Sequence, residues 1–418
     1  MGVSVANSPK VIVSHPTGNT NVSAVVNALY EEHLLEAFYT CLMWRPESRL
    51  ARLAPGGLRS TLQRRARVQL PAELVRTRPT RELVRNLLIR AGKKHWVTRE
   101  ASAFSIDGVY RDLDRTVARE LGRHREAGAV YAYDDGALHH FRRAPQFGLH
   151  RIYDLPIGYW RANQQISSEE AERKPEWKGT LNSLADSAAK LARKDEELEL
   201  ADTIAVPSTF VKNTLDLFPG AKKRVYVNPF GVPANIAAPR ELTSKSDPLR
   251  VLYVGSLTQR KGIAYLFDAV EKAGKAVTLT VIGRKVGQSD VLDRACAKHR
   301  WIASVPHSEI LALMRQHDVF VFPSLFEGLA LVNGEAVSQG LPVITTFNSG
   351  GTDILREGKD SFVVPIRDAD AITERLLQLH DDRELLKQMS DSALQQAVAL
   401  DWSGYKQRTV AMVREVLG

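Results

Sequence analysis

The sequence predicts an α/β protein with two doubly wound parallel sheets. Short apolar runs alternate with helical patterns along the chain, and strands that alternate with helices form parallel sheets. Each run is apolar throughout instead of alternating with polar residues, which is typical of strands buried on both faces. The length of 418 residues is enough for two such domains.

The elements follow in order along the chain. Residues 10–15 form an apolar run before a turn at 17–21 and a helical pattern over about 23–42. Further strands are expected at 128–133, 202–206, 225–228, 250–255, 277–283, 318–323 and 342–346. Between 233 and 249, Pro, Ala, Ser and Thr accumulate without apolar periodicity. We therefore expect domains at 1–240 and 245–400 and a last helix at 402–418 that can pack back on the first.

The composition excludes several classes of protein. Hydrophobic residues make up 44% and charged residues 25% of the chain, which excludes collagen-like, coiled-coil and wholly disordered proteins. The two cysteines, Cys41 and Cys296, lie far apart and have no metal-ligand spacing. The sequence shows no signal peptide and no run near the ~18 apolar residues that span a bilayer. We expect a cytoplasmic protein without a disulfide framework or a zinc cluster.

Two carboxylates stand out between Val319 and Asp353. Glu327 lies in a glycine-containing loop after a predicted strand, and Glu335 lies eight residues later in a helix that begins near Leu331. One regular helix would hold them about 12 Å apart. Because Gly328 breaks that path, both can face the crevice at the carboxyl end of the strand, where parallel sheets bind ligands. The alternative is a pair of solvated glutamates.

The neighbouring residues favour the crevice. Together with Pro323 and Ser324, the segment resembles the E-x7-E signature of the retaining glycosyltransferases of family 4 through Glu327, Gly328, Glu335, Ala336, Gly340, Pro342 and Val343. The segment 254–262, VGSLTQRKG, also resembles this family, and the matching stretches span most of 250–365. The resemblance implies the GT-B fold, in which two Rossmann-like domains face each other across a cleft. It also implies transfer of a sugar from a nucleotide-sugar with retention of configuration.

The chemistry of a nucleotide-sugar assigns roles in the second domain. Fixed positive charge stabilises the leaving diphosphate, so Lys261, with Arg260 beside it, is the candidate, and the helix that starts near Gly262 adds a favourable field. By resemblance, Lys261 holds the diphosphate, Glu335 the ribose and Glu327 the donor sugar. The resemblance also implies substrate contacts from Gly255, Ser256, Gly328, Leu329, Ala330 and Leu331. Ser256 departs from the arginine that is common in the family, and Gly334 from a bulkier residue.

The first domain offers weaker candidates. Gly18 and Asn19 follow the first strand, where the fold brings a loop to the donor phosphates, although a plain turn fits equally well. A second cluster, near the end of the strand at 128–133, consists of Asp134, Asp135, His139 and His140. There we expect Asp134 and His139 to face the acceptor as catalytic residues, at most one of the two histidines doing so. A surface turn is the alternative.

The implied reaction needs no protein nucleophile, no cofactor and no bound metal, because basic residues and helix ends replace the cation. Asp112 and Asp114 have Asp-x-Asp spacing, but they lie in a helical, charge-rich stretch away from the other motifs. The implied acceptor is a glycan or a lipid-linked molecule of the cell envelope. The alternatives are a nucleotide-sugar epimerase or hydrolase of the same fold, a non-catalytic partner protein, and a nucleic-acid-binding protein. The last lacks a recognisable binding module, so we expect no nucleic-acid partner.

The positive charge belongs to the first domain. The chain has 57 Lys and Arg against 48 Asp and Glu, and residues 45–100 alone hold 15 against 4. This segment includes a basic run at 64–67 and a helix-like stretch at 81–96. In that stretch Leu83, Val84, Leu87 and Leu88 recur beside Arg81, Arg85, Arg90, Lys93 and Lys94. The pattern is typical of a helix on an anionic membrane surface, and a solvated surface helix is the alternative.

Overall fold

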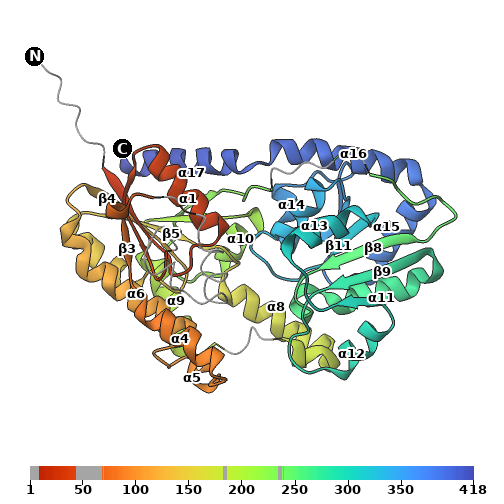
Figure 1. Cartoon of the computed structure of the whole chain (residues 1–418), viewed down its shortest axis with the longest axis horizontal. Coiled ribbons are helices and arrows are strands. Elements are labelled where there is room, and N and C mark those ends of the chain that lie inside the picture. The colour runs from red at the N-terminus through yellow and green to blue at the C-terminus, as the bar shows by residue number, and fades with distance from the viewer. Residues whose placement is uncertain (1–8, 44–67, 69, 182–185, 234–237, 239) are drawn as a thin grey trace, which may run out of the picture.

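The computed structural model describes residues 9–43, 68, 70–181, 186–233, 238 and 240–418. These residues form two parallel sheets with helices on both faces, placed side by side and joined along the top in Figure 1 by the last two helices. The basic run at 64–67 and residues 234–237 of the expected boundary lie outside the described residues. The prediction of two doubly wound α/β domains is confirmed.

The first sheet has the strand order β3-β2-β1-β4-β5-β6-β7, with parallel pairing throughout. Its strands are β1 (Lys10–Ser14), β2 (Leu35–Thr40), β3 (Val75–Thr77), β4 (Ala127–Tyr133), β5 (His150–Asp154), β6 (Thr203–Val206) and β7 (Arg224–Val227). Its helices are α1 (Thr20–Glu31), α4 (Thr80–Arg90), α5 (His95–Thr98), α6 (Ile106–Glu120), α7 (Leu138–Arg143), α8 (Trp160–Arg173), α9 (Ala188–Leu200) and α10 (Thr209–Thr214).

The second sheet has the order β10-β9-β8-β11-β12-β13 and is also parallel. Its strands are β8 (Leu249–Val254), β9 (Val277–Ile282), β10 (Arg300–Ile302), β11 (Val319–Phe322), β12 (Val343–Thr346) and β13 (Ser361–Val364). The helices that follow its strands are α11 (Ile263–Ala273), α12 (Asp290–Ala297), α13 (His307–Arg315), α14 (Leu331–Ser338), α15 (Ala369–Asp381) and α16 (Arg383–Ala399), with α17 (Trp402–Leu417) last.

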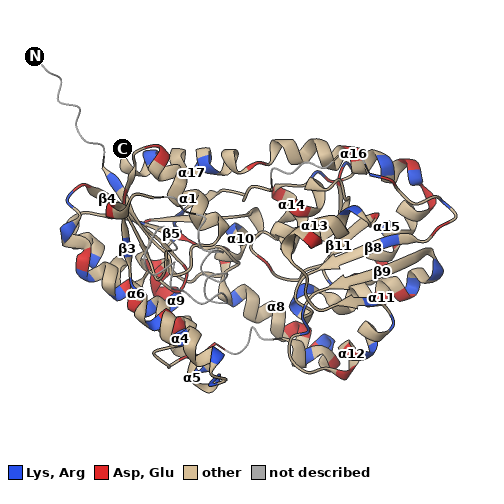
Figure 2. Ribbon diagram, viewed as in Figure 1, with Lys and Arg blue, Asp and Glu red and all other residues tan. Residues whose placement is uncertain are grey.

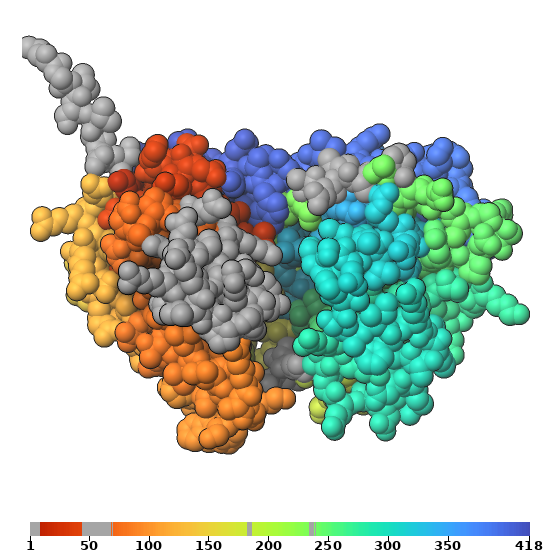
Figure 3. All heavy atoms as spheres, in the orientation of Figure 1, coloured from red at the N-terminus to blue at the C-terminus, as the bar shows by residue number. Residues whose placement is uncertain are grey.

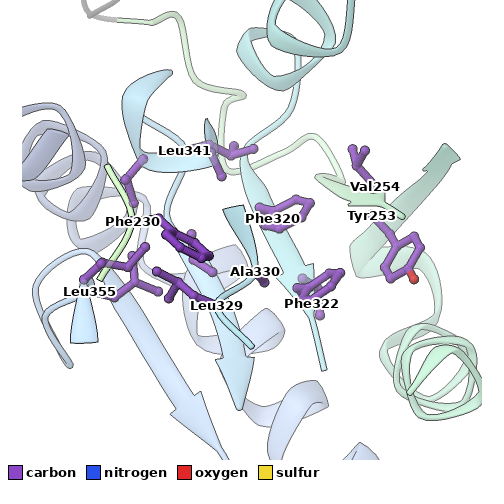
Figure 4. Packing of buried hydrophobic residues seen from close by; sticks show 14 of the residues in the cluster. Phe230, Tyr253, Val254, Phe320, Phe322, Leu329, Ala330, Leu341 and Leu355 are labelled. Carbon is purple, nitrogen blue, oxygen red and sulfur yellow. The ribbon is translucent and has the colours of Figure 1, made fainter. Parts of the chain in front are cut away.

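Alternation along β1 explains why the first sheet is covered on both faces. Val11 and Val13 pack in the core that includes α1, whereas Ile12 packs in the core that includes α6 and α7. Successive side chains of a strand point to opposite faces, so a fully apolar strand requires two apolar layers. In the second sheet, Tyr253 of β8 and Phe322 of β11 stack with ring centroids 5.9 Å apart (Figure 4).

The predicted helix over 23–42 is wrong at its second half. Helix α1 ends at Glu31, His33 adopts a left-handed backbone conformation with φ 58°, and Leu35–Thr40 is strand β2. The left-handed residue stops the helix without a glycine or a proline to mark the place. Strands β3, β5, β10 and β13 were also not predicted; each is three to five residues long.

Helix α17 returns to the first domain, as the sequence allowed. Lys406 pairs with Glu31 at 2.8 Å and Arg414 pairs with Glu32 at 2.5 Å, so the helix lies beside α1 (Figure 1). At its start, Trp402 packs so closely on Gly231 that a Cβ there would lie 2.6 Å from the Trp402 backbone. The end of the chain therefore binds together both domains.

Candidate active site

Both sheets place their topological switch points toward the space between the domains. The strand order reverses between β1 and β4 in the first sheet and between β8 and β11 in the second. Ligands of open parallel sheets bind outside the carboxyl ends of the strands at such a point. The surface is hollowed between the two domains (Figure 3), and the loops after β8 and β11 meet there.

The two most strongly predicted side chains of the second domain form an ion pair. The Lys261 ammonium donates to Glu327 Oε1, and the Arg260 guanidinium lies 3.2 Å from the same oxygen. Ser324 Oγ also donates to Glu327 Oε1 at 3.2 Å, and Arg260 donates to the Phe326 carbonyl at 2.6 Å. Lys261 and Arg260 thus hold the loop after β8 to the loop after β11, which carries both Ser324 and Glu327.

The pair is largely buried, and burial shifts the pKa of Lys261. The side chains of Lys261 and Glu327 are 13% and 12% exposed. Burial lowers the pKa of Lys261, because desolvation disfavours the ammonium, and the Glu327 carboxylate opposes this shift. The ammonium also lies 5.2 Å from the centre of the Phe322 ring. A concentrated cationic group, little solvated, is what an anionic leaving group needs.

Glycines allow the loops to come this close. Gly262 has φ 68°, and a Cβ there would lie 2.0 Å from the Pro323 carbonyl oxygen. A Cβ on Gly283, after β9, would lie 1.7 Å from the Gly255 carbonyl oxygen. Ser256 is exposed on the loop next to these backbones. Helix α11 starts directly after Gly262, as expected.

The Gly328–Leu331 loop leads into α14, as expected. The Ala330 amide donates to the Ser349 carbonyl at 2.9 Å, and the helix begins without a side-chain cap. Leu329 is buried, whereas Leu331 is 38% exposed. A Cβ on Gly328 would lie 1.8 Å from the Pro156 carbonyl oxygen. The need for a small residue at Gly328 therefore comes from the first domain.

Glu335 lies on α14, one turn into the helix. Burial raises the pKa of its carboxyl, and His307, whose Nε2 lies 3.8 Å away, opposes the shift. The neighbouring Gly334 faces Val232 of the segment between the domains, and a Cβ there would lie 2.3 Å from Val232 Cγ1. A bulky residue at this position would displace that segment. Within the described residues, no hydrogen bond joins Glu335 to Glu327.

A histidine that was not predicted organises the turn after β1. His15 is 5% exposed, and its Nδ1 accepts from the amides of Thr17 at 3.1 Å and Gly18 at 3.0 Å. Its Nε2 therefore carries the proton. Asn19 Oδ1 accepts from the Val22 amide at 3.1 Å and caps α1. The position of His15 directly after the first buried strand was the available signal.

The acidic candidate of the first domain is engaged within its own domain. Tyr153 Oη donates to Asp134 Oδ1 at 2.6 Å, and the Lys194 ammonium pairs with the other carboxylate oxygen. Lys194 also pairs with Asp135 at 3.1 Å. The fully buried Glu197 carboxylate accepts a hydrogen bond from the backbone amide of Asp135 at 3.0 Å. These contacts fix the loop between β4 and α7.

The two histidines after this loop contact helix α6. His139 Nε2 accepts from Arg115 at 2.9 Å, and His140 is fully buried with its Nδ1 2.7 Å from Asp114. Asp112 pairs with Arg81 at 3.3 Å, so neither aspartate of the Asp-x-Asp spacing is available to a metal. Within the part of the chain that the structure describes, no contact joins Asp134 or His139 to the Lys261–Glu327 pair. The described residues also show no group of three or more metal-ligating side chains.

Some first-domain residues that were not predicted from the sequence contact the loop that carries Glu327. The Gly158 amide donates to the Glu327 carbonyl at 3.2 Å, and Ser208 Oγ donates to the Gly328 carbonyl at 2.6 Å. Thr209 donates through its amide and its hydroxyl to Asp353, at 2.9 and 2.6 Å. The loops after β5 and β6 therefore close on the loops after β11 and β12.

Comparison with known proteins agrees with this geometry. Residues 236–396 match the family described as Glycosyl transferases group 1. The putative colanic acid biosynthesis glycosyltransferase WcaL of Escherichia coli is 26% identical over 171 residues, which are 37% of this chain and 42% of that protein. The glycogen synthase of Mycobacterium tuberculosis is 26% identical over 301 residues, which are 68% of each chain.

Solved structures share the whole two-domain fold. The sucrose-phosphate synthase of Thermosynechococcus elongatus superposes with a TM-score of 0.65 at 15% identity and covers 97% of this chain and 98% of its own. Anabaena HepE in complex with UDP and glucose has a TM-score of 0.62 at 15% identity, covering 97% and 100%. The second domain is therefore similar to the glycosyl transferases group 1, and the chain has the GT-B arrangement of two facing parallel-sheet domains.

Proposed function

We propose that the chain transfers a sugar from a nucleotide-sugar to a glycan or lipid-linked acceptor, with retention of configuration. The observation that carries this proposal is the Lys261–Glu327 pair, which lies at the switch point of the second sheet together with Arg260. Lys261 and Arg260 stabilise the charge that grows on the diphosphate as the glycosidic bond breaks. The donor phosphate accepts the proton of the acceptor hydroxyl, so no protein nucleophile takes part.

We extend the proposal to the remaining site residues, whose roles the resemblance to the family implies. The Glu335 carboxylate, on the uncapped helix α14, accepts from the vicinal ribose hydroxyls, and Glu327 contacts the donor sugar. The backbone of the Gly328–Leu331 loop faces sugar and phosphate, and the start of α14 adds a favourable field for an anion. Gly18 and Asn19, at the start of α1, approach the donor phosphates from the first domain. Support for a nucleotide donor comes from neighbours of the same fold that were solved with UDP and UDP-glucose.

The donor is tested by a thermal-shift panel of nucleotide-sugars on the purified chain. A true donor stabilises the native state by about 2.7 kcal/mol when its concentration is a hundred times its Kd. The same donor concentration should stabilise Lys261→Ala by about 1.4 kcal/mol or less, because its affinity is expected to fall at least tenfold. A panel in which no nucleotide-sugar shifts the wild-type melting temperature would contradict the proposal.

The acceptor class is inferred from relatives. They include glycosyltransferases named for amylovoran biosynthesis in Erwinia amylovora and capsular polysaccharide biosynthesis in Staphylococcus aureus. A cell-envelope polysaccharide or glycolipid acceptor is therefore our proposal. An assay with donor alone and then with lipid-linked acceptors tests it, because release of nucleotide without acceptor would instead indicate a hydrolase or an epimerase.

We also propose that transfer needs no bound metal, since Lys261 and Arg260 supply the positive charge beside the diphosphate. Transfer should proceed at an unchanged rate after dialysis against EDTA. A loss of activity that Mg²⁺ or Mn²⁺ restores would contradict this part of the proposal.

We propose that the first domain also meets an anionic membrane, through part of the segment expected from the sequence: Arg90, Lys93 and Lys94 are exposed, whereas Arg81 and Arg85 are half-buried. Arg81 donates to the Gly108 carbonyl at 3.1 Å and pairs with Asp112, and Arg85 lies beside buried Glu82, so contacts within the domain half-bury both side chains. The exposed side chains lie further along, at the tip formed by α4 and α5. Both apolar and basic side chains are exposed there and at the adjoining start of α6: Leu87, Ile89, Arg90, Lys93, Lys94, Trp96, Arg99 and Ile106.

We propose that this tip touches the membrane from the cytoplasmic side. Leu87, Trp96 and Ile106 are 63%, 57% and 57% exposed, and the tip projects from the first domain as the orange lobe at the lower left of Figure 3, with Lys and Arg drawn in blue in Figure 2. No helix in the described ranges has the length and apolar character to cross a membrane. Leu87→Glu with Trp96→Glu should abolish sedimentation with vesicles of 30% anionic lipid, and unchanged binding would contradict the proposal.

A further inference from the structure

Helix α8 bridges the two domains, and it contacts the loops of both members of the Lys261–Glu327 pair. Just before it, the Gly158 amide donates to the Glu327 carbonyl. Just after it, Trp177 stacks on Phe267 of the second domain with ring centroids 6.2 Å apart. The helix lies between the two domains at the bottom of Figure 1.

Glu170 of α8 is fully buried, and its described side-chain partners belong to the second domain. Its Oε1 accepts from Gln259 Nε2 at 2.7 Å and from Tyr265 Oη at 2.9 Å. Its Oε2 accepts from Arg367 Nε at 2.9 Å. A buried carboxylate is tolerated only when it is paired and hydrogen-bonded, and here three donors satisfy it.

Arg367, in the second domain, donates several hydrogen bonds to α8. Beyond Glu170 it donates to Glu169 at 2.8 Å and to the Ile166 carbonyl at 3.0 Å. Its backbone has φ 67°, a left-handed conformation that costs conformational energy in any residue with a Cβ. Such a conformation persists where the surrounding contacts determine it, and the three acceptors on α8 supply those contacts.

Gln259 connects this network to the diphosphate candidate. It is fully buried, begins the short 3-10 helix Gln259–Lys261, and lies two residues before Lys261. Its backbone amide donates to Thr180 Oγ1 at 2.9 Å, and its side-chain Oε1 accepts from the backbone amide of Ala264 at 3.1 Å. The turn that carries Arg260 and Lys261 is thus held at its first residue by groups of the first domain.

We propose that Glu170 is a positioning residue for the donor site: through Gln259 it holds the Gln259–Lys261 turn so that the Lys261 ammonium meets the donor diphosphate. This inference rests on the proposed function. A displacement of about 1 Å at a reacting group can cost on the order of a hundredfold in rate, so a buried anchor two residues away has a measurable effect. Docking of α8 on the second domain and formation of the donor site become one event.

The test is a double-mutant cycle on the binding of a nucleoside diphosphate. The probe is whichever of UDP, GDP and ADP binds the wild-type chain most tightly in calorimetry. Glu170→Gln should weaken its binding about tenfold, with little change for the corresponding nucleoside, which lacks the phosphates. In the Lys261→Ala background, Glu170→Gln should cause no further loss. The matched control is Asp268→Asn, which breaks the pair with Lys174 between the same two domains and leaves the turn untouched.

The outcomes separate the two proposals. If no nucleoside diphosphate binds, or if Lys261→Ala binds as the wild type does, the proposed function fails. If Lys261→Ala weakens binding but Glu170→Gln behaves like Asp268→Asn, the positioning role is overturned. An equal loss from Glu170→Gln with and without Lys261 would also overturn it, because that result indicates a general structural effect.

A second variant keeps the test decisive if Glu170→Gln does not fold. Gln259→Met preserves the volume of the side chain and the Glu170–Arg367 ion pair, and it removes the link between Glu170 and the turn. It should weaken diphosphate binding by about the same factor, and wild-type affinity would contradict the positioning role.

Discussion

The two domains share one topology but use their strand-end side chains differently. In the second domain, charged residues after β8 and β11 converge on each other at the switch point, as Lys261 and Glu327 show. In the first domain, two residues after β4 contact helices of the same domain instead. Asp134 pairs with Lys194 of α9, and His139 accepts a hydrogen bond from Arg115 of α6. A charged residue near a strand end therefore indicates a site only when residues of a second loop meet it.

The first prediction tests the donor half, where the largest effect is expected. Lys261→Ala should lower the transfer rate by at least tenfold, and removal of a single charge-stabilising donor in other enzymes costs about 10²–10³. Glu327→Ala and Glu335→Ala should each cost at least tenfold, about 1.4 kcal/mol. Transfer rates of variants with wild-type melting curves check this. Full activity in all three would remove the site from the second domain.

The second prediction concerns a buried acid of the first domain. Burial raises the pKa of Asp154, at the end of β5, to about 7, against an opposing hydrogen bond from Tyr131. Because the folded pKa exceeds the unfolded value near 4, this group's contribution is fully present below about pH 4 and is lost as the pH rises through 7.

Replacement of this acid should flatten the pH profile. For Asp154→Asn, the free energy of unfolding relative to wild type should rise by on the order of a few kcal/mol between pH 4 and pH 8. Urea unfolding at several pH values measures this difference. A difference that stays constant with pH would show that burial does not raise the pKa of Asp154 in the folded protein.

The third prediction addresses the place where the two halves touch. Gly328→Ala would set a Cβ 1.8 Å from the Pro156 carbonyl oxygen, so the loop or the domain interface must shift. Overpacking of this kind costs about 1–3 kcal/mol of stability, and donor affinity should fall with it. Gly404→Ala is the matched control, since on α17 its Cβ would meet only the movable end of Arg408. Equal melting temperatures for the two variants would contradict the close contact.

The smallest effects are expected in the first-domain candidates. His139→Ala should change the transfer rate by less than about twofold, because its ring accepts from Arg115 on α6. Asp134→Asn should cost about 1–3 kcal/mol of stability, because the ion pair with Lys194 is lost. The loss stays in this range because Lys194 keeps Asp135 as a partner. Kinetics and urea unfolding of both variants measure these effects. A tenfold loss of rate in stable His139→Ala would restore the acceptor role that the sequence suggested for it.

The fold was predictable because most strands contain a short run of apolar or β-branched residues. Strands β1, β4, β6, β8, β9, β11 and β12 all match expected runs. The helix expected over 23–42 was wrong because apolar residues continue at helical spacing through Leu34 and Phe38, and the left-handed His33 carries no turn signal. Short edge strands such as β3 and β10 are too brief to show a period.

The loops that carry the proposed donor site stand out in the sequence for a different reason. The proposed reaction uses a cation and two carboxylates, and these lie in two short segments: the loop after β8, and the loop after β11 with the start of α14. Glu170 could not be found in the same way, because it lies in a polar helix and becomes functional only through Gln259, 89 residues later. Its partners are set by how the domains dock, which no local pattern encodes.

The most direct test of the central claim compares one residue from each half in a single binding experiment. Calorimetry would measure the affinity of the tightest-binding nucleoside diphosphate for the wild-type chain, Lys261→Ala and His139→Ala. We predict a loss of at least tenfold for Lys261→Ala, about 1.4 kcal/mol, and wild-type affinity for His139→Ala. Wild-type affinity in Lys261→Ala would contradict the assignment of the donor diphosphate to the Lys261–Glu327 pair.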